Sequence, residues 1–290
     1  MVDANTPDVE PSEPKKFEDV LSDYQDLNDR LERVAAALRI ANADLCPKVW
    51  RDPGFTVHKL QDYPPSIRFM AEELLGLEDG KLYIRAVRRG SSAQAQFLEA
   101  GDEILSVNNQ PLSSDLSMER YNRAVLKNGF AIVKPRIEVR TSKGREFTAK
   151  IEPDTACDAP VKVVFSDAIN GHTDGEGIFI TSALMRHVID DTNLALIIAH
   201  EMSHIIAGHI ELAPSQDLEL MADQMALVLM ARAGFDVETA VEYWKDSNHP
   251  HEGGEKTKSS HPATSARYKN FKKELKRIRK TKDLNKLGFR

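Results

Sequence analysis

The chain has 290 residues, of which 41% are hydrophobic, enough for one large domain or two modest ones. Its formal net charge of -6 argues against nucleic-acid binding by the chain as a whole. The sequence contains no run of about 18 apolar residues, so no transmembrane helix is predicted.

The N-terminal region divides into a polar segment and a helix. Residues 1–15 are polar and contain prolines, and we expect them to be disordered. We also expect them to be what remains after removal of an export signal or a lipid anchor. Apolar residues from Phe17 to Leu38 recur at helical spacing, which predicts a helix over residues 16–50 that packs on the C-terminal domain.

Residues 55–153 alternate between strand-like and helical stretches. "KLYIRAV" predicts a strand, "SMERYNRAVLK" a helix, and "RIEVRTSKGREFTAKIEP" a hairpin. This succession, and above all "AGDEILSVNNQPL", resembles a PDZ domain of the bacterial protease type. The resemblance implies capture of an extended peptide, commonly a C-terminal tail, by strand addition. It assigns the capturing strand to residues 81–87 and the carboxylate-binding loop to residues 76–80.

The stretch "LALIIAHEMSHIIAGHIELAP" contains two histidines four residues apart. On a helix, His200 and His204 lie on one face, where both can bind one zinc ion. Glu201 is about 100° round the helix, where it can deprotonate a zinc-activated water without binding the metal. The helix is apolar almost all round and should be buried, and a buried cluster of this kind is costly unless a metal pairs with it. The alternative is a helix with two hydrogen-bonded histidines.

The next predicted helix offers a third ligand. In "ELMAD", Glu219 and Asp223 are again four residues apart on one helix face. Glu219 is expected to complete a site for one Zn²⁺ per chain, and Asp223 to accept a hydrogen bond from the far nitrogen of a ligand histidine. An acid pair favoured by the helix dipole is the alternative.

An HExxH motif followed by ExxxD on a second helix resembles the gluzincin arrangement. The forms "ELMADQMA" and "INGHTDGEGIFITSAL" resemble the HtpX-like and CAAX-prenyl-protease-like zinc metallopeptidases over residues 158–275. The resemblance implies a peptidase whose substrate lies extended along an edge strand before the HExxH helix. On this sequence that strand comprises Gly177, Ile178, Phe179 and Ile180.

The C-terminal region contributes two further predictions. "SSHPATSARYKNF" resembles a His-Pro segment of the same family, which implies that His261 approaches the open zinc position, with a plain loop histidine as the alternative. Residues 267–290 contain eleven basic and two acidic residues. They predict a basic C-terminal helix, either with an ordinary solvated face or in peripheral contact with an anionic membrane or an acidic partner.

The two cysteines flank the PDZ-like stretch. If the N-terminal helix packs on the peptidase region, that stretch is an insertion, and a Cys46–Cys157 disulfide would join its two ends. Two buried free thiols are the alternative. A disulfide favours an oxidising, extracytoplasmic compartment such as a bacterial periplasm.

The sequence therefore predicts an α+β protein. A mainly helical gluzincin-type domain with a small edge-strand sheet is expected at residues 154–290, and a β-barrel-like PDZ domain at residues 55–153. The predicted activity is zinc-dependent hydrolysis of peptide bonds in unfolded or extended proteins, with the PDZ domain recognising substrates or partners. The alternative is a latent or non-catalytic zinc-containing PDZ scaffold.

Overall fold

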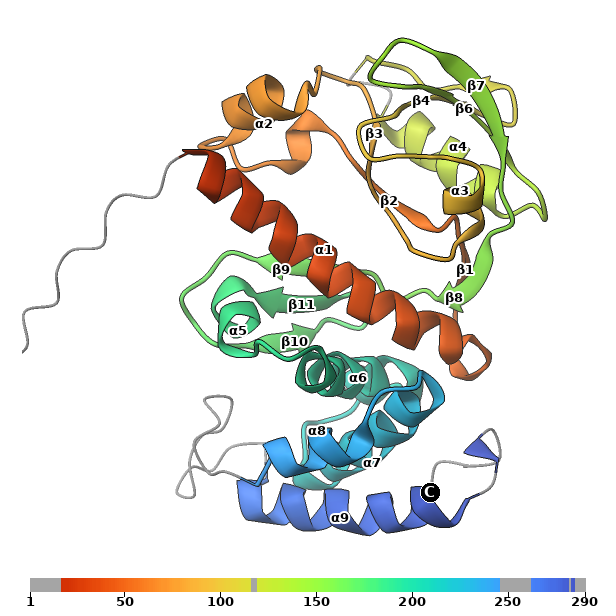
Figure 1. Cartoon of the computed structure of the whole chain (residues 1–290). Helices are drawn as coiled ribbons and strands as arrows, with labels where there is room; N and C mark the ends of the chain where they lie inside the picture. The colour runs from red at the N-terminus through yellow and green to blue at the C-terminus, as the bar shows by residue number, and fades with distance from the viewer. Residues whose placement is uncertain (1–16, 116–118, 246–261, 282, 285–290) are drawn as a thin grey trace, which may run out of the picture.

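A computed structural model describes residues 17–115, 119–245, 262–281 and 283–284. Helix α1 (Phe17–Ala41) runs diagonally between a sheet-rich insert, residues 53–153, and a helical part that follows it in the chain (Figure 1). The predicted α+β class is confirmed. No helix in the described ranges is long and apolar enough to cross a membrane.

Helix α1 joins the two parts through one apolar stripe. Its buried residues recur at i, i+4, i+7 and i+11, so they share one face, which packs into the core of the helical part. The helix is shorter than predicted, because a 3₁₀ turn, η1 (Ala43–Leu45), follows it and residues 49–50 already belong to a strand. The stripe consists of Leu27, Leu31, Val34 and Leu38.

Two short strands and a disulfide close the base of the insert. Strand β1 (Val49–Asp52) pairs antiparallel with β8 (Asp154–Cys157), and Val49 lies opposite Cys157. The predicted disulfide between Cys46 and Cys157 is confirmed, with Cα atoms 5.5 Å apart. The insert therefore leaves and rejoins the rest of the chain at one place.

The insert is built on one antiparallel sheet. The strand order is β2-β3-β4-β6-β7, with β5 paired to β4. The described sheet is open, because β2 and β7 are end strands, so the predicted barrel-like closure is wrong. Ile137 and Val139 alternate with exposed residues on β6, as expected for a strand with one face on the core. The strands are β2 (Phe55–His58), β3 (Tyr83–Val87), β4 (Glu103–Val107), β5 (Gln110–Pro111), β6 (Arg136–Arg140) and β7 (Glu146–Lys150).

Short helices complete the insert. A second small core, around Tyr63 and Leu77, lies where α2 meets the start of α1. Gly76 ends α2 in the left-handed conformation that glycine adopts at low cost. These elements are η2 (Leu60–Asp62), α2 (Arg68–Leu75), α3 (Ser92–Ala95) and α4 (Glu119–Phe130).

The helical part contains a three-stranded sheet in the order β10-β11-β9. Strand β11 (Ile178–Thr181) pairs antiparallel with β10 (Gly171–Thr173) and parallel with β9 (Val161–Val164). The prediction that residues 177–180 form the edge strand is therefore wrong. Strand β11 is paired on both sides, with Ile178 and Ile180 fully buried, and β10 is an edge of this sheet.

The helices of this part follow the sheet. Asp190 accepts hydrogen bonds from two backbone N–H groups of the first turn of α6, and Gly208 (φ 68°) ends that helix. The side chain of Ser215 accepts a hydrogen bond from the backbone N–H of Leu218 and caps α7. Helices α6 and α7 pack together, and each has nine buried residues. This packing fixes the positions of the side chains that line the contact between the two helices. The helices are α5 (Ser182–His187), α6 (Asp191–Ala207), η4 (His209–Glu211), α7 (Gln216–Arg232), α8 (Val237–Tyr243) and α9 (Thr264–Lys280).

Candidate metal centre

Three side chains converge where α6 meets the first turn of α7. His200 Nε2 lies 3.2 Å from His204 Nε2 and 3.3 Å from Glu219 Oε2, and His204 Nε2 lies 3.7 Å from Glu219 Oε1. Donor atoms held tetrahedrally about 2.1 Å from one zinc ion lie about 3.4 Å apart. The two imidazole nitrogens and the carboxylate therefore fit a single zinc ion.

The second nitrogen of His200 is held by a buried carboxylate. His200 Nδ1 lies 3.0 Å from Asp223 Oδ1, and Asp223 is fully buried. An ionised carboxylate only accepts hydrogen bonds, so Nδ1 carries a proton and Nε2 is the nitrogen that can bind a metal. Asp223 in turn accepts from Arg267, Nε to Oδ2 at 2.9 Å and Nη2 to Oδ1 at 2.5 Å. Arg267 stacks over Trp244, 4.1 Å from the ring centroid.

The electrostatics of the cluster favour positive charge at His200. Burial alone would lower the pKa of His200, but hydrogen bonds to Asp223 and Glu219 outweigh it and raise the pKa to about 9. Burial and the charge of His200 lower the pKa of His204 to about 4. Burial works against ionisation of Asp223, yet Arg267 and His200 lower its pKa. The carboxylates thus stabilise one extra cationic charge where the zinc ligands converge.

Glu201 and one edge of the sheet share a cavity with these ligands. The cavity has a volume of about 390 Å³. Glu201 lines it beside His200 and His204, β10 and the preceding Asn170 form one wall, and the segment from η4 to the start of α7 forms another. His172 on β10 stacks against Phe179 of β11, with ring centroids 5.3 Å apart. An extended peptide in this cavity would lie between β10 and Glu201.

Two residues near the cluster have contacts that the sequence did not predict. The Nδ1 atom of His209 lies 3.1 Å from His204 Nδ1, and burial lowers the pKa of His209. Arg267 reaches Asp223 from the buried face of the last helix, and because that face also carries Glu274, the sequence does not single out Arg267. His261, the other predicted catalytic residue, lies outside the described residues.

Two family models match the chain. The PDZ domain model matches residues 53–121, and the model of peptidase family M48 matches residues 158–218 and 210–275. The chain combines a PDZ domain with a family M48 metallopeptidase domain. Its His-His-Glu cluster is intact.

No curated protein matches the chain significantly. Among the solved structures that match is the HtrA3 PDZ domain bound to a phage-derived ligand (FGRWV), 23% identical and with a TM-score of 0.27. The match covers 37% of this chain and 89% of that chain.

The PDZ domain has a groove of about 830 Å³ beside its edge strand β2. Residues of β2 line one side, and α4 contributes Arg123, Leu126, Lys127 and Phe130. Strand β3 lies between β2 and β4, so residues 81–87 are not an end strand of the sheet and the predicted capturing strand is wrong. The loop before β2 borders the groove instead of residues 76–80.

The metallopeptidase domain forms the far wall of this groove. Pro160 and Val161 line it from the start of β9, and Glu32 and Arg39 line it from α1. Arg39 pairs with Glu32 and lies 3.7 Å from Asp52, whose carboxylate accepts from the backbone N–H of Gly54. A ligand in the groove would therefore touch both domains.

Proposed function

We propose that the protein is a zinc-dependent metalloendopeptidase that hydrolyses peptide bonds in unfolded or extended proteins. The observation that carries this proposal is the convergence of His200, His204 and Glu219 at zinc-like separations, with Glu201 lining the same cavity. Family M48 membership supports the same chemistry.

Each residue has one role in the proposed reaction. His200, His204 and Glu219 hold zinc, which when bound supplies a Lewis acid that lowers the pKa of water and polarises a carbonyl. Glu201 accepts the proton of the attacking water and returns it to the leaving amine. Asp223 keeps the proton of His200 on Nδ1, away from the metal.

We propose that the substrate adds as a strand to β10. The carbonyl of Asn170 accepts from the N–H of Thr181, so by antiparallel alternation the N–H and C=O of Gly171 point away from β11. Gly171 lines the cavity that contains Glu201. A peptide paired with Gly171 would run along the cavity with its backbone beside the metal ligands.

The test of the proposed activity compares Glu201→Gln with wild type. We expect the variant to keep its zinc and to lose at least about 100-fold in cleavage of an unfolded protein, because the general base is gone. Glu211→Gln, at an exposed glutamate whose side chain does not line the cavity, is the matched control and should cleave normally. Equal activity of wild type and Glu201→Gln, or no activity of wild type loaded with zinc, would favour the alternative of a latent or non-catalytic zinc-containing PDZ scaffold.

We propose that the PDZ domain recognises extended peptides, including C-terminal tails, through the groove between β2 and α4. The free edge of β2 can pair with a peptide backbone, and Leu126 offers an apolar contact beside it. Binding is measured by anisotropy of labelled peptides with free or amidated C-termini. We expect Leu126→Arg to abolish binding and exposed Ala124→Arg, which does not line the groove, to leave it intact. Equal binding by both variants would contradict this assignment.

We propose that the protein works in an oxidising, extracytoplasmic compartment such as a bacterial periplasm. The support is the Cys46–Cys157 disulfide, a bond that persists in such compartments and is rare in a reducing cytosol. Alkylation of free thiols in cell extracts before and after reduction measures the bond. Two thiols free before reduction would contradict the proposal.

We propose that α9 contacts anionic membrane surfaces. Four exposed lysines lie at i, i+4, i+7 and i+11, one face of the helix, while Phe271 and Leu275 face the core. A polybasic surface gains about 1 kcal/mol per lysine near anionic lipid. The face consists of Lys269, Lys273, Lys276 and Lys280.

Sedimentation with phosphatidylglycerol vesicles tests this contact. We expect replacement of the four lysines of α9 by Gln to weaken binding about 100-fold or more. Replacement of four exposed lysines of the PDZ domain is the matched control and should have little effect. Equal loss in both variants, or equal binding to phosphatidylcholine, would refute the proposal. The control lysines are Lys127, Lys134, Lys143 and Lys150.

A further inference from the structure

The two zinc-facing histidines differ in what holds their second ring nitrogen. His200 Nδ1 is held by Asp223. His204 Nδ1 instead lies 3.1 Å from Nδ1 of His209, with ring centroids 5.1 Å apart and planes at 70°. This edge-on geometry lets one ring N–H point at the lone pair of the other nitrogen.

We infer that His209 is a positioning residue that fixes the tautomer and ring orientation of His204. The inference rests on the proposed zinc site. His204 Nε2 faces His200 and Glu219, so its lone pair must be there and its proton must be on Nδ1. His209 then accepts this proton with its own Nδ1 and carries its single ring proton on Nε2.

The break at Gly208 is what brings His209 under His204. On an uninterrupted helix, a residue five positions on lies about 500° further round, or about 140° from His204, and faces away from it. Gly208 adopts φ 68°, which ends α6 and starts the 3₁₀ turn η4 at His209. His209 is thereby only 6% exposed.

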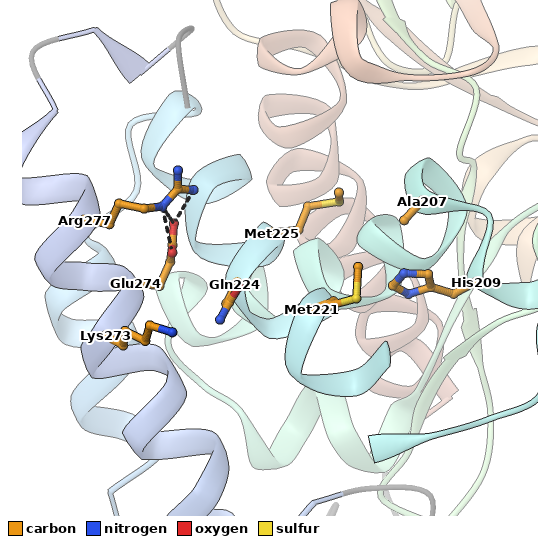
Figure 2. A pocket seen from close by; sticks show the side chains of 8 residues that line it. All are labelled: Ala207, His209, Met221, Gln224, Met225, Lys273, Glu274 and Arg277. Carbon is orange, nitrogen blue, oxygen red and sulfur yellow. Dashed lines mark hydrogen bonds and ion pairs between the residues drawn. The ribbon is translucent and has the colours of Figure 1, made fainter. Parts of the chain in front are cut away.

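The Nε2–H group of His209 also needs a hydrogen-bond acceptor. Besides the metal cavity, His209 lines a second pocket of about 320 Å³, together with Met221, Met225 and residues of α9. Figure 2 shows its ring beside Met221 at the wall of this pocket, with Lys273 and the Glu274–Arg277 ion pair on the opposite side. Water in this pocket can accept the Nε2 proton, so the tautomer that His204 needs costs no unsatisfied donor.

Three substitutions of His209 separate this hydrogen bond from mere packing. His209→Asn puts an amide oxygen near the position of Nδ1, His209→Gln puts it one bond further out, and His209→Leu removes the acceptor. Zinc affinity of the full chain is measured by chelator competition, with the visible spectrum of the cobalt-substituted protein as a second readout of ligand geometry. Loss of an outer hydrogen-bond partner weakens metal binding about 10- to 100-fold.

We expect Leu and Gln to weaken zinc binding 10- to 100-fold and to shift the cobalt spectrum, and Asn to stay within about threefold of wild type. Wild-type affinity in the Leu variant, or equal losses in Asn and Gln, would overturn the inference. Because Asn and Gln are both polar and similar in size, their comparison holds even where Leu fails to fold. No zinc in wild type would instead overturn the proposed function on which the inference depends, so the two failures are distinguishable.

Discussion

Replacing Arg267 by Met tests whether helix α9 holds the metal centre together. Arg267 donates two hydrogen bonds to Asp223, and the two side chains are only 5% and 0% exposed. Met retains much of the aliphatic stem, so the substitution chiefly removes the charge and its donors. Asp223 would keep His200 as its remaining partner.

The expected cost follows from the burial of this pair. Removing one partner of a buried ion pair costs about 3–5 kcal/mol, because the other charge is left without compensation. Arg279 provides the matched comparison on the same helix. It pairs with Glu238 at 2.7 Å, but these side chains are 54% and 58% exposed, so Arg279→Met should cost about 1 kcal/mol or less.

Urea unfolding of the full chain measures both variants. A chelator is present throughout, so that zinc binding does not contribute to stability. We expect the free energy of unfolding to fall by about 3–5 kcal/mol for Arg267→Met and by about 1 kcal/mol or less for Arg279→Met. Losses that agree within about 1 kcal/mol would refute the reasoning that burial makes the Arg267–Asp223 pair critical.

Three further predictions concern pH, the disulfide and zinc. Burial, with a smaller contribution from Arg85, lowers the pKa of His58 to about 4, so stability should fall by about 2 kcal/mol from pH 7 to pH 5, as the unfolded chain takes up the proton. His58→Gln should show a weaker pH dependence in urea unfolding, and an unchanged one would contradict this. Changing Cys46 and Cys157 to Ser should lower the free energy of unfolding by about 2–5 kcal/mol, and an unchanged urea midpoint would be the contrary result. Zinc at 100 times its Kd should stabilise wild type by about 2.7 kcal/mol but not Glu219→Ala, and equal shifts would contradict the ligand assignment.

Features set by local spacing were the predictable ones. Residues four apart on a helix share a face whatever the helix packs against, so the proximity of His200 to His204 follows from sequence. The disulfide was predictable because the two cysteines flank a stretch that forms a unit of its own. The α+β class followed from segments whose periodicity changes from helical to strand-like.

Strand order was not predictable in the same way. Periodicity indicates that a strand exists, whereas its neighbours depend on pairing between distant segments. Residues 177–180 were taken as the edge strand because the resemblance to the peptidase family implied it, yet apolar strands are favoured in the centre of a sheet. The edge that faces the metal cavity, Gly171–Thr173, is short and polar and resembles a turn. The same reasoning applies to the PDZ domain, where β3 was recognised as a strand but its place between β2 and β4 was not predicted.

Contacts to the metal ligands from distant or irregular segments also escaped prediction. Arg267 lies 44 residues from Asp223, and no local pattern joins them. His209 follows a left-handed glycine, so helical spacing gives the wrong direction for its side chain. Both contacts depend on tertiary packing, and the buried face of α9 carries two charged residues, so the sequence alone does not identify Arg267 as the one that reaches Asp223.

Zinc content per chain is the measurement that tests the central claim most directly. Elemental analysis of dialysed wild type and Glu219→Ala, both shown to be folded by circular dichroism, compares the intact ligand set with one that lacks its carboxylate. We predict one zinc per chain in wild type and clearly less in the variant, because two histidines alone leave the site incomplete. No zinc in folded wild type after incubation with zinc, or equal zinc in both proteins, would contradict the account.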